Sequence, residues 1–126
     1  MLSYALVGSN NLEAAKNFYD QLFATMGVPV LSEHPSGGRL YGQMGQTMFG
    51  VVGPFNKEAA TIGNGSMVAW ACKTREEVEQ VYKKALELGG KDEGAPGLRG
   101  PAEYNMYFAY FRDLDGNKIA VSKMGA

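Results

Sequence analysis

The chain has little of several residue types that would point to a particular chemistry. Among its 126 residues there is one cysteine, Cys72, and one histidine, His34. A single cysteine excludes an intrachain disulfide and a cysteine-based zinc cluster. No apolar run approaches the ~20 residues of a membrane span, and no charged leader precedes an apolar stretch. We therefore expect a cytoplasmic protein with no membrane partner.

The charge balance is also unremarkable. Twelve basic residues face thirteen acidic ones, and the basic side chains are dispersed along the chain. A nucleic-acid-binding surface needs clustered positive charge, so no nucleic-acid partner is expected. The length and the 45% hydrophobic content fit one domain with a substantial core.

Glycine, in contrast, is abundant, with 17 residues, many of them between positions 37 and 65. Apolar residues fill the gaps between these glycines, which is typical of short strands joined by tight turns.

Two amphipathic stretches begin with the same local pattern. Each has a helix-capping residue followed three positions later by glutamate: Asn10 with Glu13, and Thr74 with Glu77. In such a capping box the first side chain bonds a free amide of the first turn while the carboxylate reaches back. Each stretch ends at glycine, at Gly27 and at Gly89–Gly90, so helices are predicted over 12–26 and 74–88.

Short apolar segments surround both predicted helices in the same order. We predict strands at 2–7, 28–33, 39–44 and 47–52, then at 67–72, 104–111 and 118–122, with 91–101 as a loop. The fold class is therefore α+β. It comprises a first βαβββ module (1–56), a connector (57–66) and a second module (67–126), integrated in one domain.

Several segments resemble a known superfamily: the glyoxalase, bleomycin-resistance and extradiol dioxygenase proteins, also called vicinal oxygen chelate proteins. The similar segments are Asn11–Tyr19 with Met26-Gly27-Val28, Gly63-Asn64-Gly65, Gly94–Arg99 and the ending Phe111–Ile119, with Leu114 where proline is usual. The resemblance implies tandem βαβββ modules that form a curled mixed sheet around a cup. Many chemistries share this fold.

In metal-dependent members, side chains from the first and last strands of each module hold the metal. Here the matching positions fall on Tyr4, on Met67, on Ala120 and on one residue within 49–51. A catalytic divalent metal needs about three good ligands, which this set does not supply. His34 is expected away from all four positions. The resemblance therefore predicts no metal cofactor and disfavours metal-dependent lyase and dioxygenase chemistry.

A set of aromatic residues, arginines and one methionine comes from elements that the cup architecture brings together. As ligand-binding candidates it comprises Tyr4, Arg39, Tyr41, Phe49, Met67, Arg99, Tyr104, Tyr107 and Tyr110. The set fits an apolar pocket with a few polar groups, in which Arg39 or Arg99 would pair with a carboxylate or phosphate. For each residue taken singly, a place in the core or at the rim is the alternative.

Four other residues that could take part in binding or chemistry have structural interpretations. Trp70 and Cys72 share a strand face opposite to the metal-ligand position, which predicts that both belong to the core under the second helix. Asp113 and Asp115 fit a turn between the last two strands.

Three functional hypotheses remain open. The first is a protein that binds a small aromatic or amphipathic molecule between the modules without a metal. The second is a lyase- or dioxygenase-type enzyme that uses Tyr4 or Tyr41 as an acid–base group. The third is a dimeric scaffold without a ligand. A homodimer is expected from the resemblance, and the sequence leaves catalysis undecided.

Overall fold

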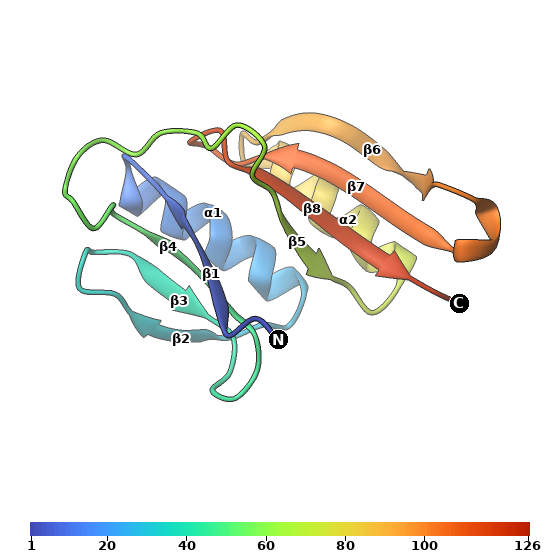
Figure 1. The fold of residues 1–126 in the computed structure, drawn as a ribbon, viewed down its shortest axis with the longest axis horizontal. Helices are drawn as coiled ribbons and strands as arrows, with labels where there is room; N and C mark the ends of the chain where they lie inside the picture. Colours follow the sequence, from blue (N-terminus) through green and yellow to red (C-terminus); the bar gives the residue numbers. More distant parts are fainter.

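Two βαβββ units follow one another along the chain in the computed structural model, which describes residues 1–126 (Figure 1). The first unit contains β1 (Tyr4–Gly8), α1 (Leu12–Thr25), β2 (Val30–Glu33), β3 (Arg39–Tyr41) and β4 (Met48–Val52). The second contains β5 (Val68–Ala71), α2 (Arg75–Glu87), β6 (Lys91–Arg99), β7 (Met106–Arg112) and β8 (Lys118–Met124). A short 3-10 helix, Ala102–Tyr104, separates β6 from β7.

The two units have the same topology. Their four-stranded sheets have the orders β1-β4-β3-β2 and β5-β8-β7-β6. In each sheet the first and last strands of the unit pair in parallel, and the other pairs are antiparallel. The α+β fold of tandem βαβββ modules is therefore confirmed.

The helices begin near the predicted capping residues, with one correction. Asn11, not Asn10, caps α1, and its side chain accepts a hydrogen bond from the amide of Ala14. The Asn10 side chain instead exchanges two hydrogen bonds with the backbone of Ala60, which fastens the segment between the sheets to the start of α1. Sequence spacing cannot distinguish these two neighbouring asparagines, because either lies close enough to cap the first turn.

Of the two hydrogen bonds predicted for the second capping box, one is present and the other is displaced. The hydroxyl of Thr74 accepts a hydrogen bond from the amide of Glu77, and Thr74 is the N-cap of α2. The Glu77 carboxylate accepts from the amide of Lys73, one residue before the position that a standard capping box uses.

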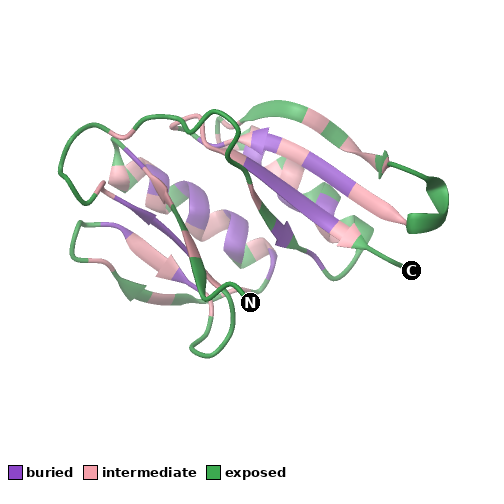
Figure 2. Ribbon diagram, in the orientation of Figure 1, coloured by how far each residue is buried: buried purple, intermediate pink, exposed green.

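Both helices lie on the same side of the sheets, behind them in Figure 1, and one core fills the space between (Figure 2). That core draws residues from both units. Tyr19 of α1 lies edge-on to Trp70 of β5 with ring centroids 5.9 Å apart, and Phe18 contacts Phe111 of β7 at 6.3 Å. Trp70 and Cys72 are buried here, which confirms that both belong to the core. The predicted place under the second helix is incomplete, because Trp70 also packs against Tyr19 and Phe23 of α1.

The segment predicted as a loop at 91–101 is largely a strand, and this prediction was wrong. β6 pairs with β7 alone, so it is an edge strand, and its register shifts between Asp92 and Gly94 and again between Gly94 and Gly97. Glycine and proline are tolerated at such edges and bulges, and Pro96 lies within the second shift. The composition that indicated a loop therefore marks an irregular edge.

A buried carboxylate joins the two units. Asp113, 4% exposed, follows β7, and its two oxygens accept hydrogen bonds from four donors. The amides of Asp115 and Asn117 and the Asn117 side chain belong to its own turn, whereas the hydroxyl of Tyr19 comes from α1. Asn117 also donates to the carbonyl of Gly8 at the end of β1. The predicted turn residue Asp113 is thus also a contact between the units.

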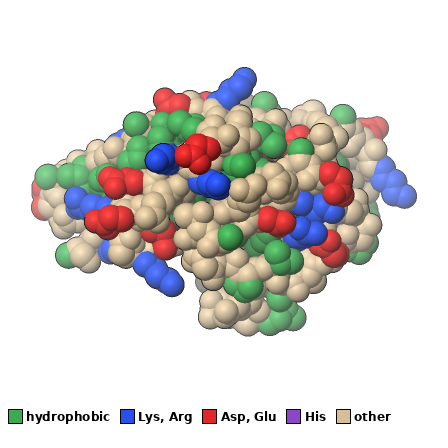
Figure 3. All heavy atoms as spheres, turned by 180° about the vertical axis from the view of Figure 1, so that it is seen from behind, with side chains coloured by type: hydrophobic (Ala, Val, Ile, Leu, Met, Phe, Trp, Pro, Cys, Tyr) green, Lys and Arg blue, Asp and Glu red, His purple; other side chains and the backbone are tan.

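The helix-covered side of the molecule carries mixed charge. Figure 3 shows this side, where acidic and basic side chains are interspersed and no extended area has a single sign. None of the helices combines the length and apolarity needed to cross a membrane.

Replacing Asp113 with alanine should destabilise the fold by about 3 kcal/mol, because it leaves the buried Tyr19 hydroxyl without its acceptor and removes three bonds within the turn. Urea denaturation measures the change. Asp115→Ala, in the same turn but half-buried and with one bond to Asn10, serves as the control and should cost less than about 1 kcal/mol. Equal losses in the two variants would contradict the role assigned to Asp113.

Candidate functional site

The alternation of side chains along each strand gives the sheets two different faces. On β1, Val7 packs against the core, while Tyr4 and Leu6 project from the face that no helix covers. Tyr4 is 57% exposed and Leu6 is 42% exposed, although both are large and apolar. This helix-free face therefore has unburied apolar surface at the strand where the two units meet.

Three hollows lie along this part of the surface. One, of about 280 Å³, is lined by Tyr4, Leu6, His34, Leu40 and Met48. A larger one, of about 930 Å³, is lined by Leu6, His34, Pro35, Ser36, Val52, Gly53, Pro54, Phe55, Lys57 and Glu58. The third, of about 240 Å³, lies between the units. Leu6 lines all three, so the hollows adjoin at this one side chain.

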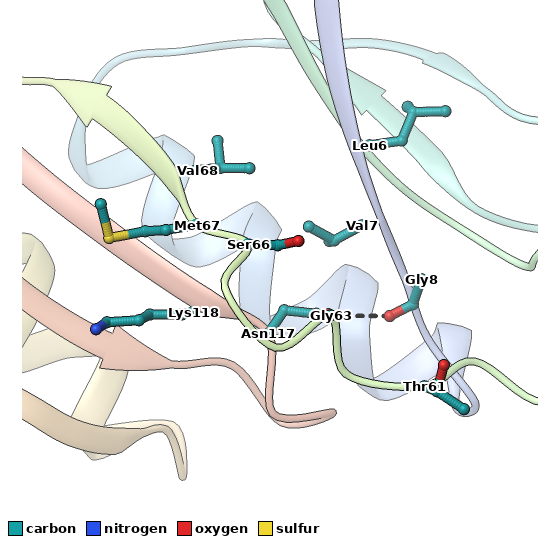
Figure 4. A pocket seen from close by; sticks show the side chains of 10 residues that line it. All are labelled: Leu6, Val7, Gly8, Thr61, Gly63, Ser66, Met67, Val68, Asn117 and Lys118. Carbon is teal, nitrogen blue, oxygen red and sulfur yellow. Dashed lines mark hydrogen bonds between the residues drawn. The ribbon is translucent and has the colours of Figure 1, made fainter.

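The hollow between the units brings together residues far apart in sequence (Figure 4). Leu6 and Val7 come from β1, whereas Met67 lies directly before β5 and Lys118 is the first residue of β8, the neighbouring strand of the second sheet. Met67 and Lys118 extend in the same direction, and the hydrogen bond from Asn117 to Gly8 closes one side. Apolar residues of both units and Lys118 therefore line one hollow, and in Figure 4 the Lys118 side chain runs away from β1.

Of the nine residues predicted to bind a ligand, Tyr4 and Met67 line these hollows. Tyr110 and Arg99 lie farther along the helix-free face of the second sheet. The Arg99 guanidinium lies over the Tyr110 ring at 5.5 Å, and the Lys118 ammonium lies 5.5 Å from the same ring. Neither cation forms an ion pair with a carboxylate.

Arg39, Tyr41 and Phe49 line none of the three hollows. Tyr41 and Phe49 are buried in the core beneath α1. Arg39 forms ion pairs with Asp20 of α1 and with Glu33 of β2, at 2.6 and 2.7 Å. Its guanidinium is therefore already occupied by carboxylates.

Tyr107 and Tyr104 are likewise outside the hollows. The Tyr107 hydroxyl donates to the Glu79 carboxylate, and the Arg75 guanidinium of α2 lies 5.0 Å from its ring. Tyr107 thus faces the helix, opposite to Tyr110 on the same strand. Tyr104 lies exposed in the short 3-10 helix that links β6 and β7.

Two groups with possible acid–base or nucleophilic character are unsuited to that chemistry. Burial, together with a hydrogen bond to Asp20, raises the pKa of Tyr41 above its ordinary value, so the hydroxyl holds its proton and lies away from the surface. Burial, with a smaller effect of Glu77, raises the pKa of the Cys72 thiol to about 12. Neither residue is an activated group at neutral pH.

The positions that the family uses for metal ligands carry side chains that do not fit a metal. In β4, Phe49 and Val51 belong to the core, which leaves Gly50 on the helix-free face. A Cβ atom at Gly50 would lie 2.4 Å from a methyl of Leu40 and 2.8 Å from a methyl of Leu6, so leucine side chains fill this place. Nowhere do three or more His, Cys, Asp or Glu side chains group as metal ligands would.

His34 was not among the predicted ligand-binding residues and was expected away from the four metal-ligand positions. In the structure it lines two of the hollows together with Leu6. The turn between β2 and β3 carries it there, because Gly38 lies directly against the backbone of β4: a Cβ on Gly38 would be 2.0 Å from the carbonyl oxygen of Val51. Only glycine permits this approach, and the pair Gly37-Gly38 was its one sequence signal.

Comparisons with known proteins agree with this architecture. The model of the Glyoxalase/Bleomycin resistance protein/Dioxygenase superfamily matches residues 2–121. A glyoxalase/bleomycin resistance protein from Albidiferax ferrireducens is 35% identical, each chain covering 98% of the other, with a TM-score of 0.85. A comparison with curated proteins gives no match.

More distant structures share the fold. A glyoxalase/bleomycin resistance protein/dioxygenase family enzyme from Burkholderia phytofirmans is 19% identical over 98% of both chains, with a TM-score of 0.72. A lactoylglutathione lyase from Agrobacterium tumefaciens is also 19% identical, over 98% of this chain and 92% of that one, with a TM-score of 0.67.

The tandem βαβββ units with one helix-free face define a glyoxalase-like protein. With the match over 2–121 and the 35% identical structure, the chain belongs to the glyoxalase/bleomycin resistance protein/dioxygenase superfamily. Membership establishes the fold and leaves the reaction open, because the fold hosts many functions.

The burial of Tyr41 predicts its behaviour at alkaline pH. Its pKa is raised in the folded state relative to about 10 in the unfolded chain, so its contribution to stability is complete below about pH 10 and declines above it. The free energy of unfolding, measured with urea between about pH 9 and 11, should therefore fall less steeply in Tyr41→Phe than in the parent chain. An unchanged slope, with Tyr41 ionising near its ordinary value by tyrosinate absorbance, would contradict the buried hydroxyl.

Proposed function

We propose that the chain binds a small aromatic or amphipathic molecule on the helix-free face around Leu6 and that it does so without a protein-held metal. The observation that carries this proposal is the sharing of Leu6 by three adjoining hollows. Together they place three concave surfaces around one side chain. Ligand sites are concave, mostly apolar and supplied with a few polar groups, and this space has those features.

The apolar part of the space is lined by Tyr4, Leu6, Leu40 and Met48 of the first sheet. Large apolar side chains exposed together at one place cost free energy in water, and a bound molecule would recover it. Covering a fully exposed leucine or methionine side chain is worth about 1.5–3 kcal/mol, and each of these partly exposed side chains would contribute a part of that.

The cationic residues near the hollow between the units favour a ligand that is amphipathic. Lys118 borders the hollow between the units, and Arg99 lies near it across the Tyr110 ring, both without a carboxylate partner. Two cations held beside one aromatic ring and not neutralised by the protein favour a ligand with an acidic group at that end.

The absence of a suitable donor set supports binding without a metal. Tyr4, Met67 and Ala120 stand at three family ligand positions, and Gly50 stands at the fourth. A tyrosine and a thioether beside two positions with no donor do not make a site for a hard divalent ion. The alternative hypothesis of an enzyme named Tyr4 or Tyr41 as the acid–base group. Tyr41 is buried, so only the exposed Tyr4 could contact a substrate.

A charged residue at the shared side chain should abolish binding. We expect Leu6→Asp to weaken the binding of anilinonaphthalene sulfonate, an aromatic anion, at least tenfold, because it puts a carboxylate where the apolar ring must lie. Fluorescence titration measures this. Leu98→Asp is the matched control, since Leu98 is an exposed leucine (46%) on β6 that lines none of the three hollows. Equal affinity of the two variants would refute the proposed location.

Metal analysis tests the second part of the proposal. The purified chain should contain less than about a tenth of an equivalent of zinc, nickel, iron or manganese after mild chelation, since no donor set is present to retain one. A stoichiometric metal that survives chelation would overturn the metal-free proposal. The homodimer expected from the resemblance stays a prediction, which light scattering measures.

A further inference from the structure

His34 stands apart from every other polar residue on the helix-free face, because it lines two adjoining hollows and its ring is fixed by the loop that carries it. We propose that His34 is a ligand-recognition residue. Its Nε2–H would donate a hydrogen bond to an uncharged acceptor oxygen, such as a carbonyl, on the aromatic molecule held around Leu6. This inference rests on the proposed function and deepens it.

The orientation of the proton follows from the backbone. The amide N–H of Ser36 donates a hydrogen bond to Nδ1 of His34, at 3.1 Å. A backbone amide is always a donor, so Nδ1 is the acceptor of that bond and carries no proton in the neutral ring. The proton of neutral His34 therefore lies on Nε2, which has no hydrogen-bond partner in the protein.

A second contact holds the same arrangement. The Ser36 hydroxyl oxygen accepts a hydrogen bond from the amide of Gly53 at 3.0 Å, and it lies 2.8 Å from Nδ1 of His34. With its oxygen engaged by Gly53, the hydroxyl hydrogen is free to point at Nδ1. The ring is therefore braced from the turn and from the end of β4, so its outward N–H is preorganised.

The turn itself is closed by backbone bonds. The amide of His34 donates to the carbonyl of Gly38, and the amide of Gly37 donates to the carbonyl of His34, both at 2.9 Å. Together with the close approach of Gly38 to Val51, these bonds limit the freedom that a loop residue normally has. The binding of a ligand would thus cost little ordering of His34.

The surroundings decide what kind of acceptor fits. The smaller hollow that His34 lines is otherwise bordered by Tyr4, Leu6, Leu40 and Met48, and a donor directed into such a mostly apolar space would need an acceptor from the ligand. At the rim of the larger hollow Lys57 and Glu58 carry opposite charges, so the hollow has no net charge that would select an ion. A neutral carbonyl group on an aromatic molecule accepts the hydrogen bond and carries no charge, so it fits both the donor and the uncharged hollow.

Two variants test the roles of Nδ1, which is bonded to Ser36, and of Nε2, which has no partner in the protein, separately. In His34→Asn the side-chain oxygen can take the place of Nδ1 and accept from Ser36, so the turn is kept while the outward donor is lost. In His34→Gln the terminal amide reaches the place of Nε2, so an outward donor is kept. Thermal denaturation and amide NMR spectra check that each variant is folded.

The probes are acetonaphthone, which has a carbonyl, and ethylnaphthalene, which has the same shape without an acceptor. Dissociation constants come from titrations followed by amide NMR. We expect His34→Asn to weaken the binding of acetonaphthone about three- to tenfold, the size of one net hydrogen bond, and to leave ethylnaphthalene within about twofold. His34→Gln should keep part of the preference for the ketone.

The possible failures are distinguishable. If both probes bind the parent chain in a Leu6-dependent way but His34→Asn binds both as the parent does, or weakens both equally, the recognition role is refuted and the proposed function stands. If neither probe binds the parent chain, or binding is indifferent to Leu6→Asp, the proposed function fails and the role of His34 fails with it.

Discussion

The buried carboxylate of Asp113 is the interaction on which the arrangement of the two units depends. A carboxylate that is withdrawn from water must have its oxygens satisfied, and here donors from its own turn and the hydroxyl of Tyr19 do so. Because Tyr19 is the centre of the aromatic core, the bond fixes the turn after β7 against α1. Asn117 extends the link to the end of β1 through Gly8. The first strands of the two sheets are thereby set beside the hollow that both border.

The division of the sheets into a helix-covered and a helix-free face determines where function can lie. Aromatic side chains such as Tyr41 and Phe49 point to the helices and form the core, so their contribution is stability. The opposite face has no helix to cover it, and Leu6 remains partly exposed there. The proposed ligand would bind on this face through apolar contact, the His34 donor and the two cations, Lys118 and Arg99, that form no ion pair.

Much of the fold could be predicted from the sequence, and much of the site could not. Helix ends and strand order follow from local capping and periodicity, which the pattern around Thr74 shows directly. The face to which Tyr41 or Tyr107 points depends on the exact strand register, because a shift of one residue moves every side chain of a strand to the opposite face. The β6 strand was not predicted because a glycine- and proline-rich edge strand has the composition of a loop. His34 could not be placed, since its position depends on a turn that folds back over β4, a contact between distant residues.

The decisive measurement is a crystal structure of the protein grown with an aromatic ketone and a divalent cation. We expect ordered density for the ketone against Leu6, with its carbonyl oxygen within hydrogen-bond distance of Nε2 of His34, and no cation held by protein side chains on the helix-free face. A cation coordinated there by three protein donor atoms, or a ketone bound elsewhere, would contradict this expectation.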